Sequence, residues 1–175
     1  MEILKETAPT VTCAAVLWDP SLASGKGLFE AVQSASSSLG IELSPVGVRD
    51  AAEMERAIVE FARFQNGGLI VTSNPLVSAH RDLIIKLAAK HKLPAVYYAH
   101  HFTDAGGLIS YGPDYVDQFR RAAGYADRIL KGEKPSDLPV QTPTKYELIV
   151  NLKTAQALNV RIPPTLAPRA DQVIE

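Results

Sequence analysis

The chain has 175 residues, of which 46% are hydrophobic and 21% charged, and its formal net charge is −1. These proportions are those of one globular domain with a core of its own, with room for a C-terminal extension. The small net charge gives no electrostatic basis for nucleic acid or an anionic membrane surface as a partner. The single cysteine, Cys13, excludes an internal disulfide and a metal site built from several cysteines. The first ten residues, MEILKETAPT, lack the features of a signal peptide.

From residue 11 onward, short apolar runs alternate with segments that have the periodicity of amphipathic helices. The run VTCAAVLW (11–18) is apolar almost throughout, which is typical of a strand buried on both faces of a parallel sheet. Further strands are expected at 41–48, 67–74, 93–98 and 105–112. Helices are expected at 27–40, 51–64, 75–91 and 113–132. This alternation predicts an α/β fold with a doubly wound, mainly parallel sheet.

The composition changes after Gly132, where half of the chain's 12 prolines lie. A last strand is expected at 146–150 and a short helix at 151–158, followed by a tail interrupted by prolines. We expect this segment to wrap over the body of the domain rather than to build a core of its own.

Polar and aromatic side chains follow the expected strands at their carboxyl ends. Ligands bind at this edge of open parallel sheets, so these side chains are the candidate binding residues. They are Asp19, Pro20 and Ser21 after the first strand, Ser73 and Asn74 after the third, His100 and His101 after the fourth, and Ser110 and Tyr111 after the fifth. The alternative interpretation is that they are polar only because loops face water.

The pair His100 and His101 raises the question of a metal or acid–base site. Adjacent side chains in an extended segment point to opposite sides, so one ion would not bind both. No Glu or Cys at a ligand spacing supports them, and Asp104 alone is insufficient. The loop SLASGKGLF (21–29) matches neither the GxxxxGK[ST] nor the GxGxxG phosphate-binding motif, and no GxSxG elbow occurs. We therefore expect no metal, no nucleotide cofactor and no hydrolase site.

Long stretches of the second half resemble the substrate-binding proteins of ABC transporters, in the branch associated with amino acids. They are AGGLISYGPDY (105–115), ILKGEKPSDLPVQTPTKYELIVNLKTAQAL (129–158) and RADQVIE (169–175). The region from VTCAAVLWDP to GGLIVTSNPLVSAHR resembles the second lobe of the same family. The resemblance implies one lobe of a type I periplasmic-binding-protein-like clamshell. It divides the chain into a leading helix (1–10), an α/β lobe (11–112), and a crossing helix, returning strand and tail (113–175).

The resemblance also implies a function, namely a non-enzymatic solute-binding component of an ABC importer. A small molecule such as an amino acid would bind between this lobe and a first lobe that lies outside the chain. The contacts from this lobe would come from Asp19, Pro20, Ser21, Ser73, Asn74, His100, His101 and Tyr111. Ser21 would suit a ligand carboxylate, and Asn74 an amino or amide group. The implied partner is the permease, and the implied location of the parent protein is periplasmic or that of an extracellular lipoprotein.

Two alternatives differ in class. One is a free-standing α/β module that senses a ligand without transport, and the other is a small enzyme that uses His100 and Asp104. Without a first lobe, the helix at 113–131 is expected to bury its apolar side chains against the parent sheet or against a second copy of the chain, as a homodimer. These side chains are Val116, Phe119, Ala123 and Ile129.

Overall fold

The computed structural model describes residues 1–175 and has a seven-stranded sheet at its centre. The strand order is β2-β1-β3-β4-β5-β6-β7, and neighbouring strands are parallel except for the antiparallel pair β5 and β6. The strands are β1 (Cys13–Trp18), β2 (Glu42–Gly47), β3 (Gly67–Val71), β4 (Ala95–Tyr97), β5 (Ile109–Pro113), β6 (Tyr146–Asn151) and β7 (Gln172–Ile174).

Helices cover both faces of this sheet. They are α1 (Glu2–Thr7), α2 (Ala23–Leu39), α3 (Ala51–Phe61), α4 (Pro75–Ala79), α5 (Arg81–Lys90), α6 (His100–Asp104), α7 (Tyr115–Leu130) and α8 (Leu152–Leu158), with two 3-10 turns at Pro135–Asp137 and Ala167–Arg169. No helix combines the length and the apolar character that a membrane crossing requires. The arrangement confirms the expected α/β fold with a mostly parallel sheet.

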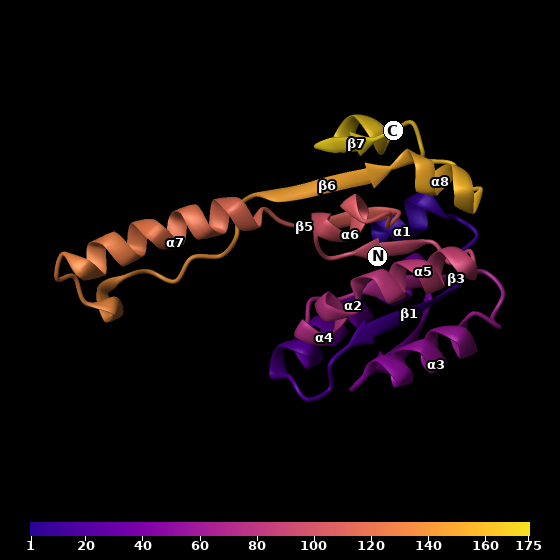
Figure 1. Ribbon diagram of the computed structural model, residues 1–175, viewed down its shortest axis with the longest axis horizontal. Coiled ribbons are helices and arrows are strands. Elements are labelled where there is room, and N and C mark those ends of the chain that lie inside the picture. Colours follow the sequence, from indigo (N-terminus) through magenta and orange to yellow (C-terminus); the bar gives the residue numbers. More distant parts are fainter.

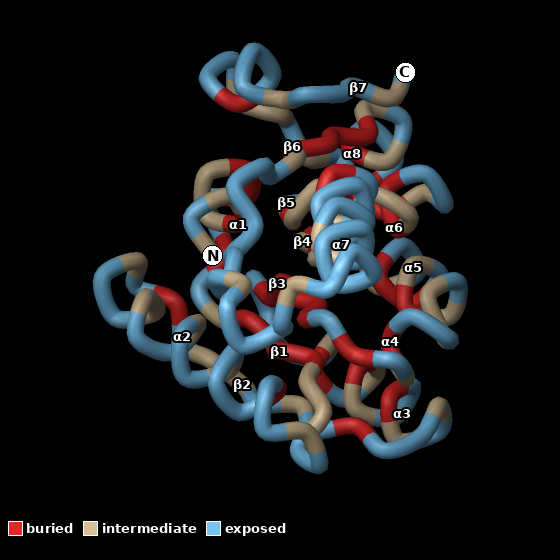
Figure 2. Tube along the Cα trace, turned by 90° about the vertical axis from the view of Figure 1, so that its left-hand side faces the viewer, coloured by how far each residue is buried: buried red, intermediate tan, exposed pale blue.

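Alternation along β1 divides the core between the two faces of the sheet. Ala14 and Val16 pack with α1 and α2 on one face, whereas Ala15 and Leu17 pack with α3, α4 and α5 on the other. All four side chains are fully buried, which explains why this segment is apolar almost without interruption. Figure 2 shows the buried centre in red beneath helices whose outer faces are exposed.

Two segments differ from the expected pattern. The helix expected at 75–91 is divided into α4 and α5 at His80, where the backbone leaves helical geometry (φ −110°, ψ 27°). The other is α6, which begins at His100, so the expectation that the histidine pair lies in an extended segment is wrong. Two glycines return the chain from α6 to β5: Gly106 has φ +104°, and a Cβ on Gly107 would lie 2.7 Å from the ring of Tyr97.

The helix α7 and the segment that returns from it form an arm (residues 114–145) that projects from the body of the domain (Figure 1). Apolar side chains of the arm are exposed, and Phe119 most clearly so, at 74%. The others are Val116, Ile129, Leu130 and Val140, and none of the five belongs to a core cluster. The expectation that this helix packs against the parent sheet is therefore wrong.

The tail after α8 lies along the last strands of the sheet. It adds β7 parallel to β6, a strand that the sequence pattern did not predict. The backbone N–H of Leu148 donates to Asp171 Oδ2 at 2.8 Å. Nearer the start of the tail, Glu6 of α1 accepts hydrogen bonds from Thr165 Oγ1 (2.7 Å) and Arg169 Nη1 (3.0 Å). These contacts tie the C-terminal segment to α1 and to β6.

Candidate ligand-binding site

The strand order places a topological switch point at the carboxyl ends of β1 and β3. The chain passes from β1 to β2 on one side and then crosses back to β3 on the other side of β1. In open α/β sheets the ligand crevice lies outside the carboxyl ends of the strands at such a point. The loop after β1 contains Asp19 to Ser21, and β3 is followed by Ser73 and Asn74. Both candidate groups therefore lie at the edge where the topology favours a ligand.

The loop after β1 is closed by its own hydrogen bonds. Ser21 donates both its hydroxyl (2.6 Å) and its backbone N–H (2.8 Å) to Asp19 Oδ1. Both hydrogen bonds lower the pKa of the Asp19 carboxyl, and the bond from the hydroxyl has the larger effect. A ligand carboxylate at Ser21 would compete with the carboxylate of Asp19. Pro20 lies against β2, since a Cβ on Gly47 would be 3.3 Å from Pro20 Cγ.

Asn74 is buried at the carboxyl end of β3, with 5% of its surface exposed. Its Oδ1 accepts a hydrogen bond from the backbone N–H of Val77 at 2.8 Å, which caps α4 and holds the side chain in one orientation. Its Nδ2 has no hydrogen-bond partner. Because a buried amide donor is costly to leave unpaired, this N–H group is a strong candidate to donate to a ligand.

Three further residues join Ser73 and Asn74. Ser78 donates its hydroxyl to the backbone carbonyl of Asn74 at 2.9 Å, so the phenol of Tyr98, 2.5 Å from the same hydroxyl, is the donor to Ser78. Tyr115, the first residue of α7, lies near Ser73. Burial raises the pKa of Tyr115, and the nearby hydroxyl of Ser73 opposes that effect. This cluster therefore connects β3, the end of β4 and the base of the arm.

The two histidines of α6 have different surroundings. His100 Nδ1 lies 3.0 Å from Asp104 Oδ2, and both side chains are about half exposed. His101 places its ring edge-on to Tyr98, with ring centroids 5.7 Å apart. Burial lowers the pKa of His101, and the charges of His100 and Arg81 act in the same direction, so its imidazole is neutral near pH 7. Only His101 therefore joins the cluster around Tyr98.

Tyr111 lies apart from this cluster. Its neighbour Ser110 points toward α6, where its hydroxyl is 2.6 Å from that of Thr103. Successive residues of a strand point to opposite faces, so Tyr111 points to the other face of the sheet. There it is half exposed and stacks on Tyr146 of β6, with centroids 5.6 Å apart. The structure therefore brings Ser73, Asn74 and His101 together and separates Tyr111 from them.

The only side-chain hydrogen bond of the two histidines joins His100 to Asp104. Neither imidazole is hydrogen-bonded to a serine, threonine or cysteine side chain. No group of three or more His, Cys, Asp or Glu side chains could hold a metal ion. The pair of His100 and Asp104 is a solvent-exposed contact of the kind that contributes little.

Tyr98, Ser78 and Tyr115 were not among the residues predicted from the sequence. Tyr98 is the last residue of the strand expected at 93–98, so its place at the edge could have singled it out. Ser78 lies one helical turn after Asn74, so the helix that follows β3 could have indicated it, whereas only the tertiary structure places Tyr115 at the start of α7 near Ser73.

Comparison with known proteins identifies relatives of the whole chain. The family model for ABC transporter substrate binding proteins matches residues 1–174. The tyrosine-binding protein of Clostridioides difficile is 25% identical over 167 residues, which are 92% of this chain and 46% of that protein. The chain therefore spans about half the length of the curated relative that it matches.

Solved structures of similar fold give the same picture. A conserved domain protein from Vibrio cholerae has a TM-score of 0.91 and 26% identity, and the match covers 98% of this chain and 58% of that one. The ABC domain from Streptococcus pneumoniae in complex with L-Trp has a TM-score of 0.91 and 23% identity, with 99% and 58% covered. A ligand-free, open substrate-binding protein with adhesive properties from Clostridium difficile has a TM-score of 0.73 and 25% identity, with the same shares covered. With a family match along almost its entire length, the chain belongs to the ABC transporter substrate-binding protein family.

Proposed function

We propose that this chain is the second lobe of the solute-binding component of an ABC importer. It would bind a small molecule such as an amino acid at the carboxyl edge of the sheet, against a first lobe. Membership of the family supports this proposal, and so do the relatives that bind tyrosine and L-Trp. The observation that carries it is the buried, unpartnered Nδ2 of Asn74 at the switch point of the sheet.

The bonding of Asn74 determines which part of a ligand it suits. Its Oδ1 already accepts the N–H of Val77, so only its N–H groups remain available. An N–H donor binds a carboxylate or carbonyl oxygen and does not bind an ammonium group. We therefore assign Asn74 to the carboxylate of an amino acid, which revises the expected role toward an amino group.

The surroundings of Asn74 suit an uncharged, aromatic side chain on the ligand. Tyr98 and His101 present adjacent rings, and the lowered pKa of His101 keeps its ring neutral. Aromatic pairs are favourable beyond the area that they bury. This surface supports an aromatic amino acid as the ligand class.

The arm is proposed to contact the first lobe, and the closed pair of lobes to be recognised by the permease. The exposed apolar side chains of α7 support the first contact, because apolar patches of this kind mark interaction surfaces. Substrate-binding proteins of this family are typically periplasmic or extracellular, and we propose the same location for the parent protein.

A nitrogen-15 NMR titration of the chain with L-tryptophan tests the ligand site. We expect shifts in the amide signals of Asn74, Tyr98 and His101, in fast exchange, with a dissociation constant of about 1 mM or weaker, because this lobe supplies only one wall of the pocket. A micromolar dissociation constant for the chain alone would contradict the proposal that this lobe supplies only one wall of the pocket. An absence of shifts at this edge would contradict the proposed position of the site.

The variant Asn74→Asp tests the assigned role. It keeps the oxygen that caps α4 but replaces the donor by an oxygen that repels a carboxylate, so binding of L-tryptophan should be lost. Asp50→Asn is the matched control, because Asp50 caps α3 in the same way, with 2.7 Å to the backbone N–H of Glu53. Equal binding by the two variants would contradict a role for Asn74.

A further inference from the structure

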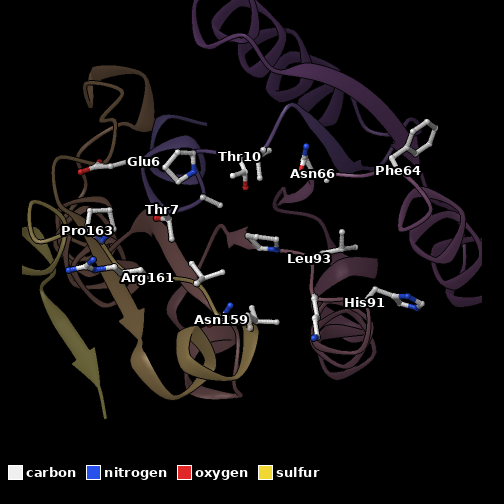
Figure 3. Close-up of a pocket in the computed structure, with 18 of the residues that line it drawn as sticks. Glu6, Thr7, Thr10, Phe64, Asn66, His91, Leu93, Asn159, Arg161 and Pro163 are labelled. Atoms are coloured by element: carbon white, nitrogen blue, oxygen red, sulfur yellow. The ribbon is translucent and has the colours of Figure 1, made fainter.

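A cavity of about 830 Å³ lies at the opposite edge of the sheet, where the strands begin. Four segments form its walls: residues 6–11, which enter β1; 62–67, which enter β3; 91–94, which enter β4; and 158–164, which follow α8. Figure 3 shows Glu6, Arg161 and Pro163 at one end of this hollow, and Phe64 and His91 at the other. The cavity is therefore separate from the site proposed at the carboxyl edge.

The size and the lining of the cavity suit a small organic molecule. Sites for such molecules measure about 300–1,000 Å³, and this cavity falls in the upper part of that range. Val11, Leu93 and Leu158 are buried side chains that line it, and the exposed ring of Phe64 stands at its rim. The cavity thus offers an apolar surface to the body of a ligand.

Thr7 is a buried polar residue of the lining. Its side chain is 3% exposed, and its Oγ1 has no hydrogen-bond partner. An unpaired buried hydroxyl destabilises a fold, and a valine would fill nearly the same space without that penalty. His91, which also lines the cavity, has a buried Nε2 without a partner. Two of the four such side-chain atoms in the molecule therefore belong to residues of this cavity.

Positive charges predominate around the cavity. Lys92 and Arg161 line it and form no salt bridge, and Lys5 lies on the same wall, where its ammonium donates to the backbone carbonyl of residue 11 at 2.8 Å. The one carboxylate of the lining, Glu6, is paired with Arg169 at 3.0 Å. The carbonyl ends of α1, α3, α5 and α8 also meet here, with about half a negative charge each. Three unpaired cations exceed that sum, so the balance favours an anion.

Helix capping explains part of this arrangement. Lys92 and Asn159 follow α5 and α8 in the left-handed conformation (φ 53° and 56°), where glycine is the usual residue. Asn66, at φ 57°, is the third non-glycine residue with positive φ, and all three line the cavity. Glycine would meet the conformational need at each position. The chain instead places one cationic and two amide side chains at the rim.

We propose that this cavity is a second ligand site, for an amphipathic organic anion. The apolar body of the ligand packs on Val11, Leu93 and Leu158, its anionic group is attracted by Lys92 and Arg161, and the hydroxyl of Thr7 donates a hydrogen bond to it. Carboxylate, sulfonate and phosphate share this chemistry. The site is independent of the amino-acid site at the other edge of the sheet.

The dye 8-anilinonaphthalene-1-sulfonate, an apolar double ring with one negative charge, is a suitable probe. We expect it to shift the amide signals of residues 7, 8, 10, 11, 66–67, 92–93 and 159–161 in nitrogen-15 NMR spectra of the chain. The uncharged N-phenyl-1-naphthylamine should bind about tenfold more weakly. Shifts confined to the arm or to the carboxyl edge would show that the cavity is not a ligand site. Equal affinity for the two probes would show that the cavity does not prefer an anionic ligand.

Two charge variants test the cations. Lys92→Gly combined with Arg161→Ala should weaken binding of the sulfonate about tenfold, and glycine suits the left-handed conformation at position 92. Lys86→Ala combined with Lys153→Ala is the control, since both lysines are exposed and lie outside the cavity. The same affinity in both double variants would overturn the proposal.

Thr7→Val separates a binding role from a structural one. It removes a hydroxyl that has no partner in the folded chain, so it should raise the melting temperature and also weaken the binding of the sulfonate several-fold. Thr7→Ser keeps the hydroxyl and should keep the binding. If Thr7→Val binds the sulfonate as well as the unmodified chain does, the hydroxyl takes no part in the site.

Discussion

Hydrogen bonds decide which residues at the carboxyl edge can reach a ligand. Ser21 gives both of its donors to Asp19, whereas Asn74 uses its oxygen to cap α4 and keeps its N–H groups free. His101 is neutral and lies against Tyr98, so it offers an aromatic surface rather than a charge. The carboxyl edge of the sheet therefore presents one hydrogen-bond donor, the side-chain amide of Asn74, beside the rings of Tyr98 and His101.

Gly25 marks a close approach between α2 and the loop after β1. A Cβ at this position would lie 2.3 Å from the backbone oxygen of Asp19. We expect Gly25→Ala to lower the free energy of unfolding by about 2 kcal/mol, because the helix or the loop must move to relieve the overlap. Urea unfolding followed by circular dichroism measures the change.

Gly27→Ala is the matched control for that prediction. It lies in the same helix, and a Cβ there would have no atom within 4 Å. Since alanine favours a helix over glycine, this variant should gain up to about 1 kcal/mol. A similar change in both variants would show that helix propensity, and not the approach to Asp19, determines the effect.

His101 should make the stability of the fold depend on pH. Burial lowers its pKa in the folded chain, so the unfolded chain binds more protons below the usual histidine value of about 6.5. This contribution to stability is complete above that value and is lost as the pH falls toward the folded pKa. Proton NMR of the imidazole should give a midpoint below about 6.5. His101→Gln should weaken the acid dependence of the melting temperature, and a midpoint above the usual value would refute the prediction.

At the scale of elements, burial explains which strands were predictable from the sequence. β1 and β3 are buried on both faces, and only apolar residues fit there, so their sequences predict strands. The helix α6 depends on the ring of Tyr97 over Gly107, a contact that exists only after the sheet has formed. The short strand β7 depends on the edge of β6, and its three residues are too few to show a period.

The sequence predicts at which edge of the sheet the candidate site lies, but not which residues belong to it. Parallel strands share one carboxyl edge, so the residues that follow them locate the site from sequence alone. Whether a side chain joins the site depends on tertiary contacts. Tyr111 points to the face opposite Ser110, while Tyr115 reaches Ser73 from the base of α7. The cavity at the opposite edge has no sequence signal, because four separate segments form it.

At the scale of the whole molecule, the body and the arm are held together differently. The body has buried clusters on both faces of the sheet. The arm is held by polar contacts between α7 and its return segment, such as Tyr125 Oη to the carbonyl of Pro139 and Arg121 Nη2 to Thr144 Oγ1, both 2.6 Å. Its apolar side chains remain exposed, and an amphipathic helix with an exposed apolar stripe is incomplete without a partner.

We expect the chain, taken by itself, to self-associate through the arm. Phe119 is the test residue, because its exposed ring lies on α7. Each of the two symmetry-related rings contributes about 1.5 kcal/mol to a twofold interface, so removing both costs about 3 kcal/mol in total and weakens the dimer about 100-fold. Phe119→Ser should therefore be monomeric by light scattering where the unmodified chain is dimeric. Arg120→Ser, a neighbouring exposed position on the same helix, should stay dimeric. A monomeric unmodified chain at high concentration, or dimers in both variants, would show that the arm does not mediate self-association.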